Sequence, residues 1–116
     1  MLVVYGIPNC DTVKKAKKYL EENNIEFQFH NFKKDGVDKT QVEAWLSQIP
    51  ADMLINKRGT TWRALPDETK QNLTAEVAVE LALENPSIIK RPVVDNQGQF
   101  SVGFKAQDWD KAFLSE

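Results

Sequence analysis

The sequence contains one cysteine and one histidine among its 116 residues. A single cysteine, Cys10, cannot form an internal disulfide, which suits a reducing compartment. A structural zinc site normally needs four Cys or His ligands, so such a site is nearly excluded. Val13 rules out an internal Cys-x-x-C pair, and Ala16 stands where a phosphatase-type loop needs arginine. Any redox chemistry at Cys10 therefore needs a resolving thiol from another molecule.

Long apolar runs and strong net charge are also missing. No run approaches the length of a membrane span, and the net charge is −2 with 28% charged residues. We therefore expect no attraction to nucleic acid or to a membrane surface. The N-terminal residues lack the basic segment of a secretory signal. We predict a single cytoplasmic domain spanning residues 1–116, and nothing in the sequence demands more than a monomer.

Cys10 follows a short apolar run, residues 2–5, that is typical of a buried strand. Residues 6–9 break this strand, and a helical pattern begins at Cys10 with Asn9 as the expected N-cap. Unpaired N–H groups and the helix dipole in the first turn favour a thiolate over a thiol. The position thus predicts a reactive cysteine, although free cysteine is also commonly a small buried apolar residue.

The helical pattern continues to about residue 22, with Val13, Ala16 and Leu20 on one face. Four lysines occupy the other side: Lys14, Lys15, Lys17 and Lys18. They form either a solvated face or a positive field near Cys10 that assists an anionic substrate, and Lys14 is the candidate nearest the thiol.

Residues 25–32 alternate like a strand, with His30 on the polar side. We expect a surface histidine there rather than a base.

The middle of the chain is predicted to be helical after a loop at residues 33–38. Asp38 and Gln41 resemble a capping box in front of an apolar stripe that Pro50 ends. Residues 57–61 read as a polar break between short helices, with Pro66 as a start signal. Thr74 should cap a largely buried helix over residues 75–84, which Asn85 and Pro86 end.

The last third favours a hairpin and a helix. Val93 and Val94 read as a strand that Pro92 precedes, residues 96–98 as a turn, and residues 99–102 as the returning strand. A final helix over residues 106–114 places Trp109 and Phe113 on one face. The order β-α-β, helices, β-β-α predicts an α/β, thioredoxin-like fold with a helical insertion at about residues 38–86. Ligands collect beyond the carboxyl ends of strands in such sheets, where Cys10 lies.

Three segments carry a family resemblance: Tyr-Gly-Ile-Pro-Asn-Cys-Asp-Thr-Val-Lys (5–14), Ile-Asn-Lys-Arg (55–58) and Ile-Ile-Lys-Arg-Pro-Val-Val (88–94). Together they resemble the arsenate reductase (ArsC)/Spx family, and most of all its single-cysteine YffB-like branch. The resemblance implies a nucleophilic Cys10 and an anion site lined by Arg58 and Arg91. It also implies a cis Arg91–Pro92 peptide whose backbone, at Pro92, faces the thiolate where a bound thiol would pair. Arginine suits such a site because its planar fork donates two hydrogen bonds to one anion.

The chain also departs from the arsenate reductases of this family. Gly6 replaces a histidine and Val13 replaces a serine near the nucleophile. No arginine follows the hairpin, where Lys105 is the nearest cation, and a lysine does not reproduce a bidentate fork. These differences weaken the expectation that arsenate, in particular, is the substrate. Val13 also excludes the disulfide switch of Spx proteins.

Two functions follow from the resemblance. The first is a glutathione-dependent thiol reductase without a bound cofactor, in which Cys10 attacks a thiol-derived or small oxyanion substrate and glutathione or glutaredoxin resolves the product. Glutathione is then a cosubstrate, and arsenate is one candidate substrate. The alternative is an Spx-like module that binds RNA polymerase or another protein without catalysis. A vestigial thiol in a structural domain is the third.

Overall fold

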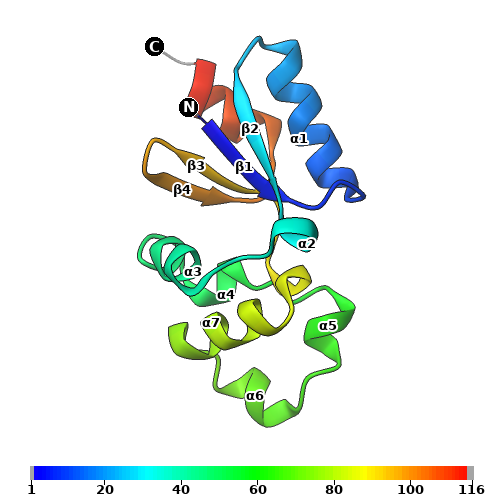
Figure 1. Cartoon of the computed structure of the whole chain (residues 1–116), viewed down its shortest axis with the longest axis vertical. Coiled ribbons are helices and arrows are strands. Elements are labelled where there is room, and N and C mark those ends of the chain that lie inside the picture. Colours follow the sequence, from blue (N-terminus) through cyan, green and yellow to red (C-terminus); the bar gives the residue numbers. More distant parts are fainter. Residues whose placement is uncertain (1, 115–116) are drawn as a thin grey trace.

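A computed structural model describes residues 2–114 of the chain. Four strands form one sheet in the order β2-β1-β3-β4. Their bounds are β1 Leu2–Gly6, β2 Phe27–Asn31, β3 Val93–Asn96 and β4 Gln99–Val102. β1 pairs with β2 in parallel, and both other pairings are antiparallel. Figure 1 shows α1 beside this sheet and the inserted helices at one end of it. The fold is mixed α/β and thioredoxin-like, as predicted.

The parallel pair is joined through α1, Asp11–Glu22, whose buried residues are the predicted Val13, Ala16 and Leu20. The next strand begins at Phe27 rather than at residue 25. Ile25 belongs to the exit of α1 because its N–H donates to Leu20 O at 2.9 Å. This hydrogen bond delays the start of the strand by two residues.

The predicted loop after β2 was wrong in its first half, because a short helix, α2 (Phe32–Asp35), follows the strand directly. Asn31 ends the strand and caps this helix. Its Oδ1 accepts from the N–H groups of Lys33 at 2.9 Å and Lys34 at 3.2 Å. A cap of this kind satisfies donors that the first helical turn leaves free.

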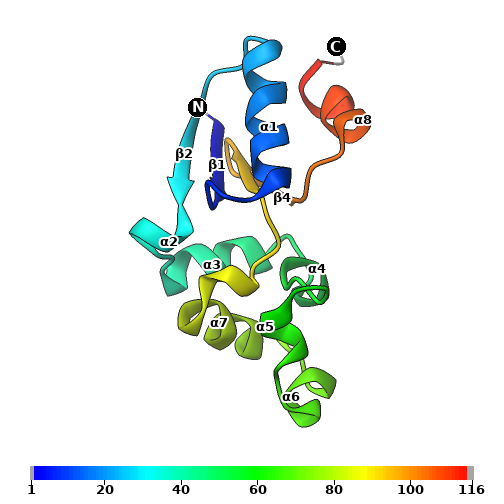
Figure 2. The same cartoon turned by 90° about the vertical axis from the view of Figure 1, so that its right-hand side faces the viewer.

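The insertion contains α3 Lys39–Leu46, α4 Ala51–Leu54, α5 Thr60–Arg63, α6 Asp67–Gln71, α7 Ala75–Glu84 and the 3-10 turn η1 Pro86–Ile88. Figure 2 shows these helices stacked beneath the sheet. The capping box of Asp38 and Gln41 is confirmed, and Thr74 caps α7 as expected. The expected polar break was too long, since α5 already begins at Thr60. In α7, Leu83 remains 41% exposed, so the helix is buried along one face only.

Two apolar clusters hold the layers together. Val93 packs toward the insertion, in the cluster that contains Trp45 and Ile89. Its neighbour Val94 packs toward α1 and Trp109, in the other cluster. Adjacent strand residues point to opposite faces, so β3 contributes to both cores.

The end of the chain differs from the expected single helix. α8 (Ala106–Trp109) is a single helical turn, and the wider π-helical turn η2 (Asp110–Leu114) follows it. Trp109 and Phe113 share a face as predicted, with ring centroids 5.4 Å apart. The hairpin turn is also as predicted, with Gln97 and Gly98 at positive φ. Within residues 2–114, no helix is long and apolar enough to cross a membrane.

Candidate active site

Cys10 is the N-cap of α1, which begins one residue later than expected, at Asp11. The predicted cap, Asn9, was wrong because Cys10 itself has extended backbone angles (φ −95°, ψ 125°). The Cys10 carbonyl accepts from Lys14 N at 3.0 Å, so the residue is anchored to the first turn. The thiol, which is partly exposed, lies just beyond the carboxyl end of β1. This is the location that the sequence predicted.

The surroundings of Cys10 favour its ionised form. Burial alone would raise the pKa of the thiol. Against it act the backbone N–H of Val13, the side chain of Arg91, the N–H of Thr12 and the positive charge of Arg91, and the net result is a lowered pKa. Helix-terminal N–H groups and a neighbouring guanidinium both stabilise a thiolate. The thiolate form of Cys10 is therefore more favoured than in a free cysteine.

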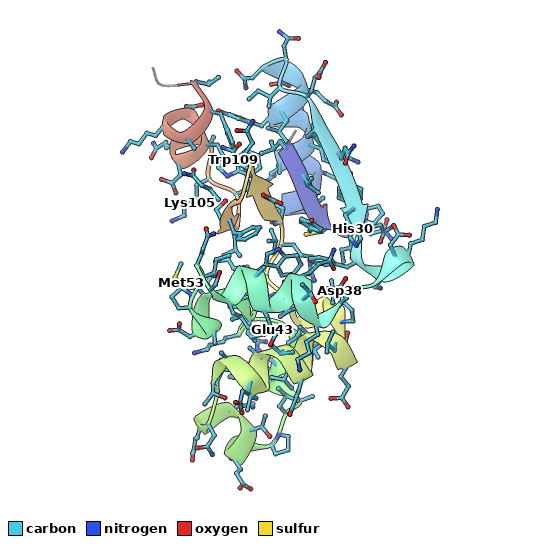
Figure 3. The ribbon with its side chains drawn as sticks, turned by 60° about the vertical axis from the view of Figure 1, so that its left-hand side comes forward. His30, Asp38, Glu43, Met53, Lys105 and Trp109 are labelled. Atoms are coloured by element: carbon cyan, nitrogen blue, oxygen red, sulfur yellow. The ribbon has the colours of Figure 1, made fainter. Side chains whose placement is uncertain are left out.

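A pocket of about 570 Å³ opens at Cys10 between the insertion and the C-terminal segment. Figure 3 shows Met53 on the insertion side, with Lys105 and Trp109 on the opposite side. The full lining is Cys10, Thr12, Met53, Asn56, Lys90, Arg91, Ser101, Val102, Gly103, Phe104, Lys105, Asp108, Trp109 and Ala112. Three of these residues are cationic and one is acidic. Its size and charge suit a small anionic ligand with apolar parts.

Arg91 is the half-buried cation of this pocket. Its Nη1 donates to Ser87 O at 2.8 Å, and its Nε is buried without a hydrogen-bond partner. The Arg91–Pro92 peptide is cis, as the resemblance implied.

Pro92 has no N–H, and its carbonyl already accepts from Gly103 N at 2.9 Å. Within the described part of the chain, the N–H and C=O of Arg91 form no hydrogen bond. The backbone groups without a protein partner at this point are therefore those of Arg91, and pairing of a thiol at Pro92 itself stays a prediction.

The other predicted residues are distributed unevenly. Lys105 lines the pocket, whereas Lys14 and Arg58 are exposed and do not. The backbone N–H of Arg58 donates to Asn56 Oδ1 at 3.2 Å, which holds the loop but leaves the guanidinium outside the lining. Their part in anion binding stays a prediction.

His30 does not line the pocket either. It is half-buried rather than on the open surface: its ring lies 5.0 Å from that of Tyr5, and its Nε2 is 2.8 Å from Gly36 O.

Sequence reasoning missed several pocket residues. Lys90 stands directly before Arg91, and its side chain reaches Gly103. Met53, which is 54% exposed, and Trp109 form apolar parts of the wall. Only Lys90 had a signal in the sequence, because it is a cation directly before the Arg-Pro step. The contributions of Met53 and Trp109 depend on how the insertion and the C-terminal segment meet, which no local pattern shows.

Gly6 and Val13, the two departures near the nucleophile, contact each other. A Cβ placed on Gly6 would lie 2.8 Å from Val13 Cγ2, closer than carbon atoms pack. Val13 is completely buried. The two substitutions thus form one packing unit behind Cys10.

A partly exposed cysteine at a strand-to-helix turn, in one pocket with the arginine of a cis Arg-Pro step, is the kind of site found in thioredoxin-like thiol proteins. The sequence model of the ArsC family matches residues 5–112, and the chain belongs to this family. It is 42% identical to an uncharacterized protein of Haemophilus influenzae, over 97% of this chain and 99% of that one. It is 26% identical to the global transcriptional regulator Spx of Streptococcus pyogenes, over 99% of this chain and 86% of that protein.

Two solved structures are similar over nearly their whole length. The YffB protein has 39% identity and a TM-score of 0.91, with 99% of this chain and 100% of that chain covered. An arsenate reductase (ArsC) related protein from Brucella melitensis has 41% identity and a TM-score of 0.80, with 99% and 95% covered. The similarity therefore includes the insertion as well as the sheet.

Proposed function

We propose that the protein is a glutathione-dependent thiol reductase of the cytoplasm that uses the Cys10 thiolate as its nucleophile. The observation that carries this proposal is the joint position of Cys10 and Arg91 in one cationic pocket. Glutathione carries two carboxylates and a thiol on a peptide backbone. Lys90, Arg91 and Lys105 offer charges for the carboxylates, and the free N–H and C=O of Arg91 offer a peptide-like pairing partner.

The proposed reaction consists of two thiol–disulfide exchanges. The Cys10 thiolate attacks the glutathione sulfur of a mixed disulfide, the S–S bond breaks, and the substrate leaves as a thiolate. A second glutathione, as its thiolate, or a glutaredoxin thiol then attacks the mixed disulfide on Cys10. This step releases oxidised glutathione, or a glutaredoxin mixed disulfide, and restores the Cys10 thiolate. Each exchange breaks one S–S bond and forms another, so the cycle consumes one thiol, releases one and conserves electrons.

Arsenate is the less favoured substrate. A tetrahedral oxyanion is held best by several bidentate arginines. Here one guanidinium N–H of Arg91 is already taken by Ser87 O, and Arg58 lies outside the pocket lining. The cationic residues that remain in the pocket are lysines. This arrangement favours a thiolate and a carboxylate over a bound arsenate.

The test is an NADPH-coupled assay with glutathione, glutathione reductase and a glutathionylated peptide, with and without glutaredoxin. We expect turnover by the wild-type protein and background rates for Cys10→Ser. When Arg91→Ala is measured in the same assay, Arg63→Ala is its control, because Arg63 is an exposed arginine outside the pocket. Arsenate replaces the peptide in a second series. If neither the glutathionylated peptide nor arsenate is turned over, the reductase proposal is contradicted.

The alternative is a regulatory module that binds RNA polymerase or another protein without catalysis. The similarity to Spx regulators supports it, as does the exposed Met53 at the rim of the pocket. Binding of purified RNA polymerase that persists in Cys10→Ser, together with no reductase activity in the wild type, would favour this alternative.

A further inference from the structure

The turn η1 leads from α7 to Arg91 and leaves one of its carbonyl groups for the arginine. Three of the four carbonyls in residues 85–88 accept a backbone N–H. The pairs are Asn85 O with Ile88 N (3.0 Å), Pro86 O with Ile89 N (3.1 Å) and Ile88 O with Asn56 N (2.8 Å). The fourth, Ser87 O, accepts from Arg91 Nη1 at 2.8 Å. The Ser87 carbonyl is therefore an anchor point for the Arg91 guanidinium.

The side chain of Asn85 fixes Ser87 in turn. Its Oδ1 accepts from Ser87 N at 3.2 Å and from Ser87 Oγ at 2.6 Å. Asn85 is at once the C-cap of α7 and the N-cap of η1. This oxygen accepts one hydrogen bond from the backbone and one from the side chain of Ser87, and together they hold Ser87 in place, as expected for an asparagine cap.

Apart from its hydrogen bond to the Cys10 thiol, few other interactions orient the guanidinium. The Nε of Arg91 is buried without a partner, and Ser87 O is the one oxygen acceptor found for this side chain in residues 2–114. Movement of Ser87 would therefore displace the guanidinium that shares the pocket with Cys10. Other charged groups near the thiol are Lys90, Lys105 and Asp108 in the pocket and Asp11 and Lys14 in the first turn of α1. None of them contacts Asn85 or Ser87 through a hydrogen bond or ion pair in the described part of the chain.

We propose that Asn85 is a positioning residue: acting through the Ser87 backbone, it holds the Arg91 guanidinium beside the Cys10 sulfur. Asn85 is exposed and does not line the pocket. The inference concerns the ionisation of Cys10, so it can be tested without a substrate and separately from the reductase proposal.

The experiment measures the Cys10 pKa from thiolate absorbance in the ultraviolet as a function of pH. We expect Asn85→Ala to raise this pKa by roughly half a unit, a partial loss of the arginine's effect. Below that pKa, the rate of alkylation of Cys10 should then fall by about threefold, because only the thiolate reacts. Asn85→Gly removes the same oxygen and remains an acceptable cap. If the alanine variant does not fold, Asn85→Gly replaces it in this measurement, and we expect the same rise in the Cys10 pKa.

Thr74→Ala is the matched control. Thr74 Oγ1 caps the other end of α7 by accepting from Val77 N at 3.2 Å. Its loss removes a cap on the same helix, far from Arg91 in sequence. We expect lower thermal stability, as for the Asn85 variants, and an unchanged Cys10 pKa.

A double variant distinguishes positioning from a general structural effect. In an Arg91→Ala background, the further change Asn85→Ala should add no rise in the Cys10 pKa, because the charge it positions is gone. An Asn85 variant that folds and keeps the wild-type pKa would overturn the proposal. So would a rise of equal size in the Arg91→Ala background, or in Thr74→Ala.

Discussion

Individual residues around Cys10 differ in how they act on the thiol. Arg91 lies in the pocket beside the sulfur, whereas Arg58 is exposed and outside it. We predict that Arg91→Ala raises the Cys10 pKa and slows alkylation of Cys10 near neutral pH, because a neighbouring positive charge is removed. Arg58→Ala should leave the pKa unchanged. Thiolate absorbance against pH measures both, with Arg63→Ala as the control arginine. An equal rise in Arg58→Ala would show that its guanidinium reaches the thiol after all.

The contact between Gly6 and Val13 gives a prediction about packing. Gly6→Ala should destabilise the fold by about 1–3 kcal/mol, because its Cβ would lie 2.8 Å from Val13 Cγ2. In the double variant Gly6→Ala, Val13→Ala, the total loss should be smaller than the sum of the single losses. Urea unfolding of the four proteins measures this coupling.

Gly59→Ala is the control for this series. The nearest atom to its added Cβ is the side-chain Nδ2 of Asn56 at 3.2 Å, which can move away. Additive losses at Gly6 and Val13 would contradict a direct clash between the two positions.

Among the elements, the C-terminal segment depends most on one side chain. Trp109 is 5% exposed and packs edge-on against Tyr19, Phe104 and Phe113. We predict that Trp109→Ala lowers the free energy of unfolding by about 3–5 kcal/mol, as for other large core truncations. Leu114→Ala, at a residue 47% exposed in the same segment, should change it by less than about 0.5 kcal/mol. Urea unfolding provides the comparison. Similar losses in both variants would contradict the inference that the C-terminal segment depends on Trp109.

Element predictions from the sequence succeeded where a local signal was complete. Asp38 with Gln41, and Thr74 in front of an apolar helix, satisfy their helix ends with their own side chains, so four to five residues contain all the information. The failures lie where a distant or competing contact decided. Asn31 capped a helix in a stretch that still alternated like a strand, and Cys10 replaced Asn9 as cap because its backbone stays extended. At the C-terminus, no residue pattern distinguished one helix from an α turn followed by a π turn.

At the scale of the molecule, the order of elements predicted the sheet but only part of the pocket. Cys10 was placed correctly because a strand-to-helix turn fixes it by topology alone. The cis Arg91–Pro92 peptide came from family resemblance, since most X-Pro bonds are trans. The pocket wall formed by Met53 and Trp109 could not be predicted, because it joins an inserted helix to a C-terminal segment more than fifty residues away. Long-range packing of this kind leaves no local pattern.

The thiol also links the pH dependence of stability to the site. Because the Cys10 pKa is lowered in the folded protein, ionisation favours folding. This contribution is fully present above the unfolded pKa of about 8.5 and is lost as the pH falls through the folded value. We predict that wild type gains stability relative to Cys10→Ser as the pH rises across this interval. Urea unfolding at a series of pH values measures the difference.

Tyrosines titrate at higher pH and also change stability, in both proteins alike. Burial and the neighbouring Asp110, which accepts from the Tyr19 hydroxyl at 2.6 Å, raise the pKa of Tyr19 to about 12. The stability gained from the un-ionised hydroxyl is present below the ordinary tyrosine pKa of about 10 and is lost as the pH rises toward the folded value. Both proteins contain Tyr19, so its effect cancels in their difference. In an Arg91→Ala background, the stability that the Cys10 protein gains over its Cys10→Ser variant as the pH rises should be smaller. The reason is that the folded and unfolded pKa values of Cys10 then lie closer together. A difference that does not change with pH would mean that the folded protein does not favour the thiolate.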